Sequence, residues 1–219
     1  MLYLIQPGEY DLYRQDLDSM YRLRYRVFYE SLKWDVSVEN GMERDQYDEK
    51  NMYYLIYKDD NGIIRGCIRF VEMINDCMFD GPFKFTLPNL DEFKRPGYWE
   101  LSRYSVDISA SEDYKVHMHQ KVAKSIMAGL IDFGLTIERV ECFLTLTYPS
   151  LTKLCKKYGL LTYVVSSAKI NQEDIDVWAF QPMSHVYDKI AKSLKINKLS
   201  NNANDFNIHT SLHTSLTLP

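Results

Sequence analysis

The spacing of apolar residues divides most of the chain into alternating helix-like and strand-like segments. Over residues 13–32 the apolar positions recur every three to four residues and polar side chains fill the opposite face, which predicts an amphipathic helix. Three further helices are predicted, at residues 116–133, 149–158 and 182–194. Gly159 directly follows residues 149–158, at the position where a glycine commonly caps a helix C-terminus.

Runs rich in β-branched and aromatic residues fill the spaces between these helices. Residues 53–58 and 63–71 flank Asn61-Gly62, a dipeptide typical of tight hairpin turns. Four more strands are predicted, at residues 98–106, 140–147, 160–166 and 175–181. Because a hairpin joins the first two strands while helices separate later ones, the sequence predicts an α/β (α+β) fold with a mixed sheet backed by helices.

The ends of these patterns also predict the domain organisation. We expect one domain over residues 1–195, followed over residues 196–219 by a polar, mobile C-terminal tail rich in Asn, Ser and Thr. Residues 34–51 mix acidic side chains with Asn40-Gly41 and show neither helical nor strand periodicity. This segment is predicted to be a long loop, and loops of that length are commonly functional or disordered.

Composition and charge exclude several classes of protein. The chain has 219 residues, of which 46% are hydrophobic and 26% charged, which is enough to bury an ordinary soluble core. It has no run of about 18 apolar residues and no secretory signal at its start, so we expect a cytoplasmic protein without a membrane partner. A net charge of −4 gives no overall reason to bind nucleic acid. The cysteines lack ligand-like spacing and His117 and His119 form a lone pair, so no metal site is predicted.

Arg24 does not fit the helix that carries it. It lies on the apolar stripe of residues 13–32, where a guanidinium cannot lose its water unless acceptors pair with it. The acidic loop supplies candidate partners in Glu43, Asp45 and Asp48. The sequence therefore predicts a buried charge network, the alternative being an exposed helix end from which Arg24 reaches water.

Aromatic residues lie close to these carboxylates in the sequence. Phe28 and Trp34 precede the acidic loop, which on its own would be interpreted as a solvated charged segment. An apolar wall beside fixed negative charge is a site that could hold a cationic or amine-bearing ligand.

Two strands carry charged residues that also need explanation. In a regular strand Glu100 and Arg103 would point to opposite faces, because side chains alternate with a period of two. A β-bulge would break this alternation, and bulges occur frequently beside active sites. Arg69 alternates with Ile68 and Phe70, so it either faces solvent or joins the charge network.

The segments RLRYRVFYESLKWDV, ERDQYDE, GCIRF and ELSRYSV together closely resemble the N-acyl-homoserine-lactone (autoinducer) synthases of LuxI type, over most of residues 20–160. The residues that carry the resemblance, in order, are Arg24, Phe28, Trp34, Asp45, Asp48, Arg69, Phe83, Glu100 and Arg103. The resemblance implies a GNAT-like acyltransferase fold, with a mixed, twisted sheet that splays into a central cleft flanked by helices. It also implies that an acyl chain passes from acyl carrier protein to the amine of S-adenosylmethionine, followed by lactonisation.

The resemblance further implies roles for these residues. Glu100 would take the proton of the attacking amine, with Glu43 as a second candidate, and Arg103 would belong to the same catalytic group. The S-adenosylmethionine pocket and its charge network would be formed by Arg24, Phe28, Trp34, Asp45, Asp48, Arg69 and Phe83. Around Phe83 the chain departs from the family pattern, so Phe79 or Phe85 could take its place. Backbone N–H groups freed by a bulge within residues 101–104 would stabilise the oxyanion.

The acyl donor and its recognition follow from the same resemblance. Thr145, or failing that Thr147, would influence the choice of acyl chain, and Lys153, Lys156 and Lys157 would form a basic patch for an acidic carrier protein. The glycine-rich loop with which GNAT enzymes hold the pyrophosphate of coenzyme A is absent before residues 116–133, which favours the carrier protein while leaving acyl-CoA possible. No cofactor is expected, since S-adenosylmethionine would be a substrate. The competing interpretations are a GNAT-type N-acyltransferase that uses acyl-CoA and another amine, and a non-catalytic module that binds S-adenosylmethionine or the carrier.

Overall fold

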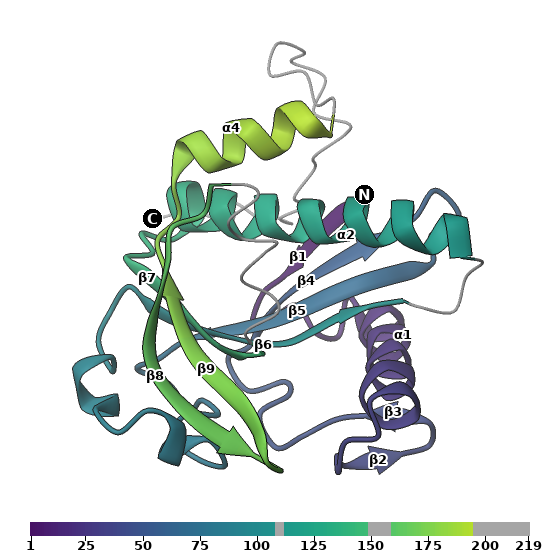
Figure 1. The fold of residues 1–219 in the computed structure, drawn as a ribbon. Helices are drawn as coiled ribbons and strands as arrows, with labels where there is room; N and C mark the ends of the chain where they lie inside the picture. The colour runs from purple at the N-terminus through teal and green to yellow at the C-terminus, as the bar shows by residue number, and fades with distance from the viewer. Residues whose placement is uncertain (108–111, 149–158, 195–219) are drawn as a thin grey trace, which may run out of the picture.

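A seven-stranded sheet forms the centre of the computed structural model, which describes residues 1–107, 112–148 and 159–194, with backbone alone for residues 112–117 (Figure 1). In spatial order its strands are β1 (Leu2–Ile5), β4 (Tyr53–Lys58), β5 (Ile64–Glu72), β6 (Tyr98–Val106), β7 (Cys142–Thr147), β9 (Glu173–Phe180) and β8 (Thr162–Ile170). Neighbouring strands are antiparallel except for the parallel pair β6–β7. The predicted mixed sheet is therefore confirmed.

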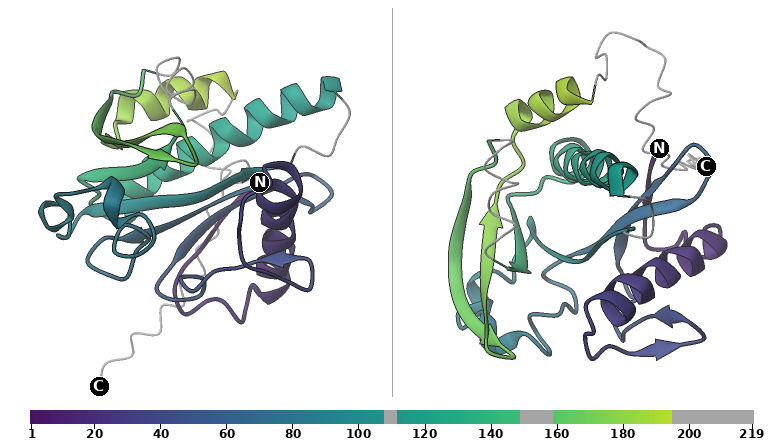
Figure 2. Two further views of the ribbon diagram at one scale, coloured as in Figure 1. Left: turned by 60° about the horizontal axis from the view of Figure 1, so that its bottom comes forward. Right: turned by 45° about the vertical axis from the view of Figure 1, so that its right-hand side comes forward.

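Helices cover both faces of this sheet. On one face lies α1 (Arg14–Arg24), which continues as a π-helix over Tyr25–Ser31. On the other lies α2 (Glu112–Asp132), which also ends in a π-helical segment, Phe133–Ile137, and α4 (Ser184–Ser193) packs beside α2 (Figures 1 and 2). Two short 3₁₀ helices, Lys84–Thr86 and Leu90–Glu92, lie between β5 and β6. No helix in the described ranges is long and apolar enough to span a membrane.

The alternation of side chains along the central strands produces two hydrophobic cores. On the α2 side, Phe70, Trp99 and Phe133 belong to an aromatic cluster, in which the Phe70 and Phe133 rings meet edge to face with centroids 4.9 Å apart. On the α1 side, Leu17 and Val71 belong to a second core. The sheet is thus buried on both faces, and any polar group on its α1 side must find partners within the protein.

Gly66 allows α2 to lie directly against β5. A Cβ atom at this position would lie 2.2 Å from Val122 Cγ1 and 3.2 Å from the Ser105 carbonyl oxygen. We expect Gly66→Ala to lower the free energy of unfolding by about 1–3 kcal/mol, because α2 or β5 must shift to admit the methyl group. Urea denaturation would measure this loss. A Val122→Ala background should reduce it, whereas an equal loss in both backgrounds would place the strain elsewhere.

The two central strands separate part of the way along their length. β6 and β7 pair from Tyr98 opposite Cys142 to Leu101 opposite Thr145, and β6 then continues to Val106 without β7 as a partner. This is the splayed centre of the sheet that the resemblance implied. The last part of β6 therefore pairs with β5 and not with β7, between the two halves of the sheet.

The structure corrects the sequence-based prediction at three places. β1 was not predicted, and it is a short strand that pairs with β4 at the edge of the described sheet. The predicted helix over residues 13–32 changes to π-helical geometry at Tyr25. The predicted loop over residues 34–51 contains a small hairpin of β2 (Val38–Glu39) and β3 (Met42–Glu43), whose turn residues Asn40 and Gly41 have φ of 52° and 70°.

The C-terminal predictions are only partly covered by the described residues. The hairpin of β8 and β9 and helix α4 correspond to the predicted strands and helix, although β8 begins at Thr162 and extends to Ile170. The predicted helix at residues 149–158 and the predicted tail at residues 196–219 lie outside the described residues.

Candidate functional site

Arg24 is completely buried at the end of α1 and pairs with two carboxylates of the acidic segment. Its Nε donates to Glu43 Oε2 at 2.5 Å, and its Nη1 and Nη2 donate to the two oxygens of Asp48 at 2.8 Å each. The Asp48 carboxylate also accepts the Asp45 backbone N–H at 2.8 Å, which fixes the turn that carries both aspartates. The buried charge network predicted around Arg24 is confirmed, and the alternative of an exposed helix end is excluded.

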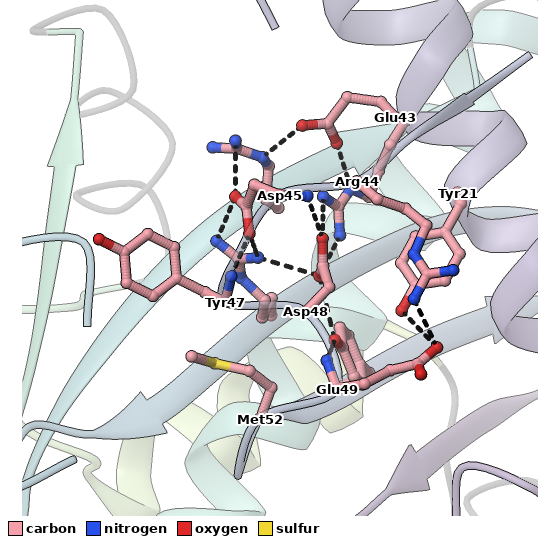
Figure 3. Close-up of polar contacts among 12 residues, drawn as sticks. Tyr21, Glu43, Arg44, Asp45, Tyr47, Asp48, Glu49 and Met52 are labelled. Atoms are coloured by element: carbon pink, nitrogen blue, oxygen red, sulfur yellow. Dashed lines mark hydrogen bonds and ion pairs between the residues drawn. The ribbon is translucent and has the colours of Figure 1, made fainter. Parts of the chain in front are cut away.

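Two further arginines close the network from the sheet. Arg69 of β5 binds Asp45 through Nη1 and Nη2 at 2.6 and 3.0 Å, and its Nη1 also donates to Asp48 Oδ1 at 2.9 Å. Arg103 of β6 donates from Nε to Glu43 at 3.0 Å, and its Nη2 lies 2.8 Å from Asp45 Oδ2. Figure 3 shows the Glu43, Asp45 and Asp48 carboxylates turned toward one another through these contacts. Arg69 therefore joins the network instead of facing solvent.

Pairing keeps the aspartates of this network ionised. Burial would raise the pKa of Asp48, but Arg24 and Arg69 outweigh it and hold that pKa well below its usual range. Burial would likewise raise the pKa of Asp45, and Arg69 lowers it below the usual value. Three guanidinium groups and three carboxylates thus form a buried cluster whose formal charges balance.

A β-bulge places Arg103 in this cluster. Cys67 pairs with Ser105 and Arg69 pairs with Ser102, so β6 carries one more residue than β5 between these pairs, and Arg103 has a φ of 54°. Leu101 and Tyr104 consequently both pack toward the α2-side core, while Ser102 and Arg103 both contact groups of the network. The bulge predicted from the mismatch of Glu100 and Arg103 is confirmed.

Glu100 lies beside the cluster without belonging to it. Only 2% of the residue is exposed, and its Oε2 accepts the Phe79 backbone N–H at 3.0 Å. Burial raises the pKa of Glu100, and the nearby positive charge of Arg69 offsets part of that rise. Glu100 also lies opposite Leu144 of β7, one residue before β6 and β7 separate. A buried carboxylate with a raised pKa at a break in the sheet is suited to accepting a proton.

An aromatic wall borders the network. Phe28 is buried in the π-helix and stacks on Trp34, with ring centroids 5.0 Å apart and an angle of 21° between the planes. The Arg103 guanidinium lies 5.6 Å from the centre of the Phe28 ring. Trp34 remains 38% exposed, so it lies where the network meets the surface.

The three phenylalanines considered near residue 83 occupy different environments. Phe79 is buried, and its backbone N–H holds Glu100. Phe83 is partly buried against the α1-side core, whereas Phe85 is 59% exposed. Of the three, Phe79 is therefore the one that contacts a candidate catalytic residue directly.

The remaining candidate residues lie apart from the network. Thr145 is the last residue of β7 that pairs with β6, and Thr147 follows two residues later on the same face. Alternation places both on the face of buried Phe143, which packs in the α2-side core, and opposite to that of Leu144. Lys153, Lys156 and Lys157 lie outside the described residues.

Sequence reasoning missed several partners of the network. The Tyr54 hydroxyl donates to Asp48 at 3.0 Å, Ser102 Oγ accepts from Arg69 Nε at 3.2 Å, and Met78 Sδ accepts from Arg69 Nη2 at 3.2 Å. The sequence carries a signal for Tyr54, because a tyrosine in a buried strand needs a hydrogen-bond partner. It carries no signal that marks Met78 as a partner of Arg69. In the described parts of the chain, no group of three or more His, Cys, Asp or Glu side chains is arranged to hold a metal ion.

Comparisons with known proteins agree with this architecture. Residues 8–189 match the autoinducer synthase family. An acyl-homoserine-lactone synthase from Agrobacterium fabrum (strain C58 / ATCC 33970) is 31% identical over 155 residues, which cover 71% of this chain and 73% of the relative.

Solved structures show the same fold. The AHL synthase LasI, 24% identical, superposes with a TM-score of 0.75 over 88% of this chain and 94% of its own. BjaI, a CoA-dependent acyl-homoserine lactone synthase solved with SAM and isopentyl-CoA, is 17% identical and gives a TM-score of 0.74 over 90% of each chain. The GNAT-like fold implied by the resemblance is confirmed. The chain belongs to the autoinducer synthase family of LuxI type, a family of acyltransferases.

Proposed function

We propose that this enzyme transfers an acyl chain from a thioester to the amine of S-adenosylmethionine and then closes the lactone, releasing an acyl-homoserine lactone and methylthioadenosine. The observation that carries the proposal is that a charge-balanced arginine–carboxylate cluster lies beside a separate buried carboxylate, that of Glu100. The cluster gives the site a fixed shape, and Glu100 supplies a base where β6 leaves β7.

The cluster keeps donors that an amino-acid substrate can use. Arg69 Nη2 and Arg103 Nη1 both point at the sulfur of Met78, at 3.2 and 3.6 Å. A thioether is a weak acceptor, so the carboxylate of S-adenosylmethionine would be a much better partner for these N–H groups. The Phe28–Trp34 stack provides an apolar wall on which the cationic substrate can rest.

Glu100 is the better of the two candidate bases. Both oxygens of Glu43 already accept hydrogen bonds, one from Arg24 and the other from Arg103, so Glu43 serves to position the arginines. The Glu100 carboxylate accepts the Phe79 backbone N–H, and burial raises its pKa above the ordinary value of a glutamate. It can therefore take the proton that the amine must lose to attack the thioester carbon.

The bulge and the substrate itself complete the reaction. Backbone N–H groups released from pairing near Arg103 would stabilise the oxyanion that forms when the amine attacks. The intermediate then collapses, and the thiol of the donor leaves. In the second step a carboxylate oxygen of the acylated substrate displaces methylthioadenosine from the carbon attached to the sulfonium, and the protein mainly holds the reacting atoms together.

We propose acyl carrier protein as the donor, with acyl-CoA as the alternative that a CoA-dependent relative such as BjaI makes worth testing. We expect charge reversal at Lys153, Lys156 and Lys157 to raise the apparent KM several-fold for an acyl carrier thioester. The KM for the matching acyl-CoA should change little, because the basic patch would contact the carrier and not the acyl chain. Steady-state kinetics with both donors make this comparison, and an unchanged KM for the carrier would contradict a docking role.

Mass spectrometry tests the proposal as a whole. The purified enzyme is incubated with S-adenosylmethionine and a panel of acyl carrier thioesters, with matched acyl-CoA donors alongside. Appearance of lactone and methylthioadenosine in equal amounts supports the proposal, and the panel also identifies the donor and acyl chain. Acylation of another amine without methylthioadenosine would favour a GNAT-type N-acyltransferase. Binding of S-adenosylmethionine without product from any donor would favour a non-catalytic module.

A further inference from the structure

Arg103 has a backbone conformation that is unusual for an arginine. Together with Tyr104 it stands opposite Ile68 in the bulge of β6, and its φ of 54° is one that glycine normally supplies in a bulge. Glycine would relieve this strain but would remove the guanidinium, which binds Glu43 and Asp45. A strained conformation of this kind persists only where the surrounding groups hold it in place.

Two buried side chains hold the carbonyl oxygen of Arg103. Ser105 Oγ donates to it at 3.2 Å, and Cys67 Sγ makes a longer contact of 3.9 Å with the same oxygen. Both residues are 1% exposed, and they lie opposite each other where β5 pairs with β6. A thiol is the weaker donor of the two, so the Ser105 hydroxyl supplies the main contact to this carbonyl.

The hydroxyl restrains the backbone on the C-terminal side of the strained residue. The Arg103 carbonyl belongs to a planar peptide group, so a hydrogen bond to its oxygen restrains the whole group. Arg103 can relax toward ordinary strand angles only if the backbone beside it turns, and such a turn would change the direction of its side chain. The bond from Ser105 therefore opposes a movement that would take the guanidinium away from Glu43 and Asp45.

A buried hydroxyl needs an acceptor in any protein, so the contact alone would fit a purely structural role. Two further observations favour a role in the site. The acceptor belongs to the residue with the strained φ, and the Arg103 Nη1 of that residue lies 3.6 Å from Met78 Sδ. Arg69 Nη2 reaches the same sulfur, at the position proposed above for the carboxylate of S-adenosylmethionine.

We propose that Ser105 is a positioning residue for Arg103, whose hydroxyl holds the bulge in the conformation that aims the guanidinium at the substrate carboxylate. The inference deepens the proposed function and rests on it for the identity of that substrate. The hold of Ser105 on Arg103 itself is a property of the protein without substrate, so it can be measured separately.

NMR of the arginine Nε–H groups in the full-length enzyme measures this hold directly. Arg65 Nε on β5, which donates to Asp59 at 2.8 Å outside the cluster, serves as the internal reference. The two signals are identified by their loss in Arg103→Lys and Arg65→Lys. We expect Ser105→Ala to speed the exchange of the Arg103 Nε–H with water several-fold and to leave that of Arg65 unchanged. An unchanged Arg103 signal, or an equal change in both signals, would overturn the proposal.

Ser105→Cys is the second variant. It keeps a weaker donor at the same position, so the Arg103 signal should change in the same direction but by less than in Ser105→Ala. If Ser105→Ala does not fold, the same comparison of the Arg103 and Arg65 signals in Ser105→Cys decides the proposal.

Steady-state kinetics connect the position of Arg103 with substrate binding. We expect Ser105→Ala to raise the KM for S-adenosylmethionine by about 2–10-fold, the range for loss of one hydrogen bond, and to leave the KM for the acyl donor unchanged. A smaller folded fraction would instead lower kcat and leave both KM values unchanged. Ser125→Ala, which removes a buried hydroxyl from α2, is the matched control and should keep both KM values. A selective change of the Arg103 signal without a change in KM would support the positioning role and contradict the proposed contact of Arg103 with this substrate.

Discussion

Glu100→Gln is expected to lower kcat by about 10²–10⁴-fold, the range that a general base contributes. Glutamine has nearly the same shape, and its side-chain oxygen can still accept the Phe79 N–H, but it cannot take a proton from the amine. Because the residue lies outside the arginine–carboxylate cluster, the thermal unfolding temperature should change little. Single-turnover rates and thermal unfolding of the same preparation measure the two effects.

Glu72→Gln is the matched control for this substitution. Glu72 lies at the end of β5 and also accepts a backbone N–H, that of Gly97 at 2.8 Å, but it contacts none of the arginines of the cluster. We expect this variant to keep turnover within a few-fold of the unmodified enzyme. Near-normal turnover of Glu100→Gln would remove Glu100 from the role of base, and a similar loss in both variants would mean that the effect is structural.

The sequence was sufficient to predict the cluster but not its pairings. Arg24 was identified because a charge on an apolar stripe needs partners, and that reasoning requires only helical periodicity. It could not predict that Asp48 pairs with Arg24 and Arg69 while Asp45 pairs with Arg69 and Arg103, because that choice depends on a turn closed by the Asp45 N–H. Local pattern therefore determined which residues are buried, and loop conformation determined which of them meet.

The same distinction between local pattern and tertiary contact explains which other features could be predicted from the sequence and which could not. The bulge at Arg103 was predictable, since two charged residues three apart on one strand share a face only if the alternation is broken. The sequence analysis did not predict β1 because the conformation of a strand as short as Leu2–Ile5 depends on its pairing with β4. The local sequence carries no signal for that pairing. The contact of Phe79 with Glu100 runs through the backbone, so the identity of the side chain could not indicate it.

Arg24→Met is expected to produce the largest loss of stability, about 3–5 kcal/mol at neutral pH. Methionine fills much of the same space, but it leaves Glu43 and Asp48 buried without the donors that Arg24 supplies from Nε and both Nη atoms. Arg22→Met on the same helix is the matched control, since Arg22 is exposed and makes one long contact to the Asn40 carbonyl oxygen at 3.4 Å. Denaturant unfolding of both variants should show a loss of less than about 0.5 kcal/mol for Arg22→Met.

Acidic pH should distinguish loss of pairing from loss of packing in Arg24→Met. In the unmodified protein the folded-state pKa of Asp48 lies below its value in the unfolded chain, about 3.9. Its stabilising contribution is therefore complete above that value and is lost as the pH falls toward the folded pKa. Without Arg24 the folded pKa of Asp48 rises, so the variant gains stability by taking up a proton as the pH falls from 7 to about 4. The stability difference between the two proteins should accordingly narrow over this range, whereas a cavity or packing defect would leave it constant.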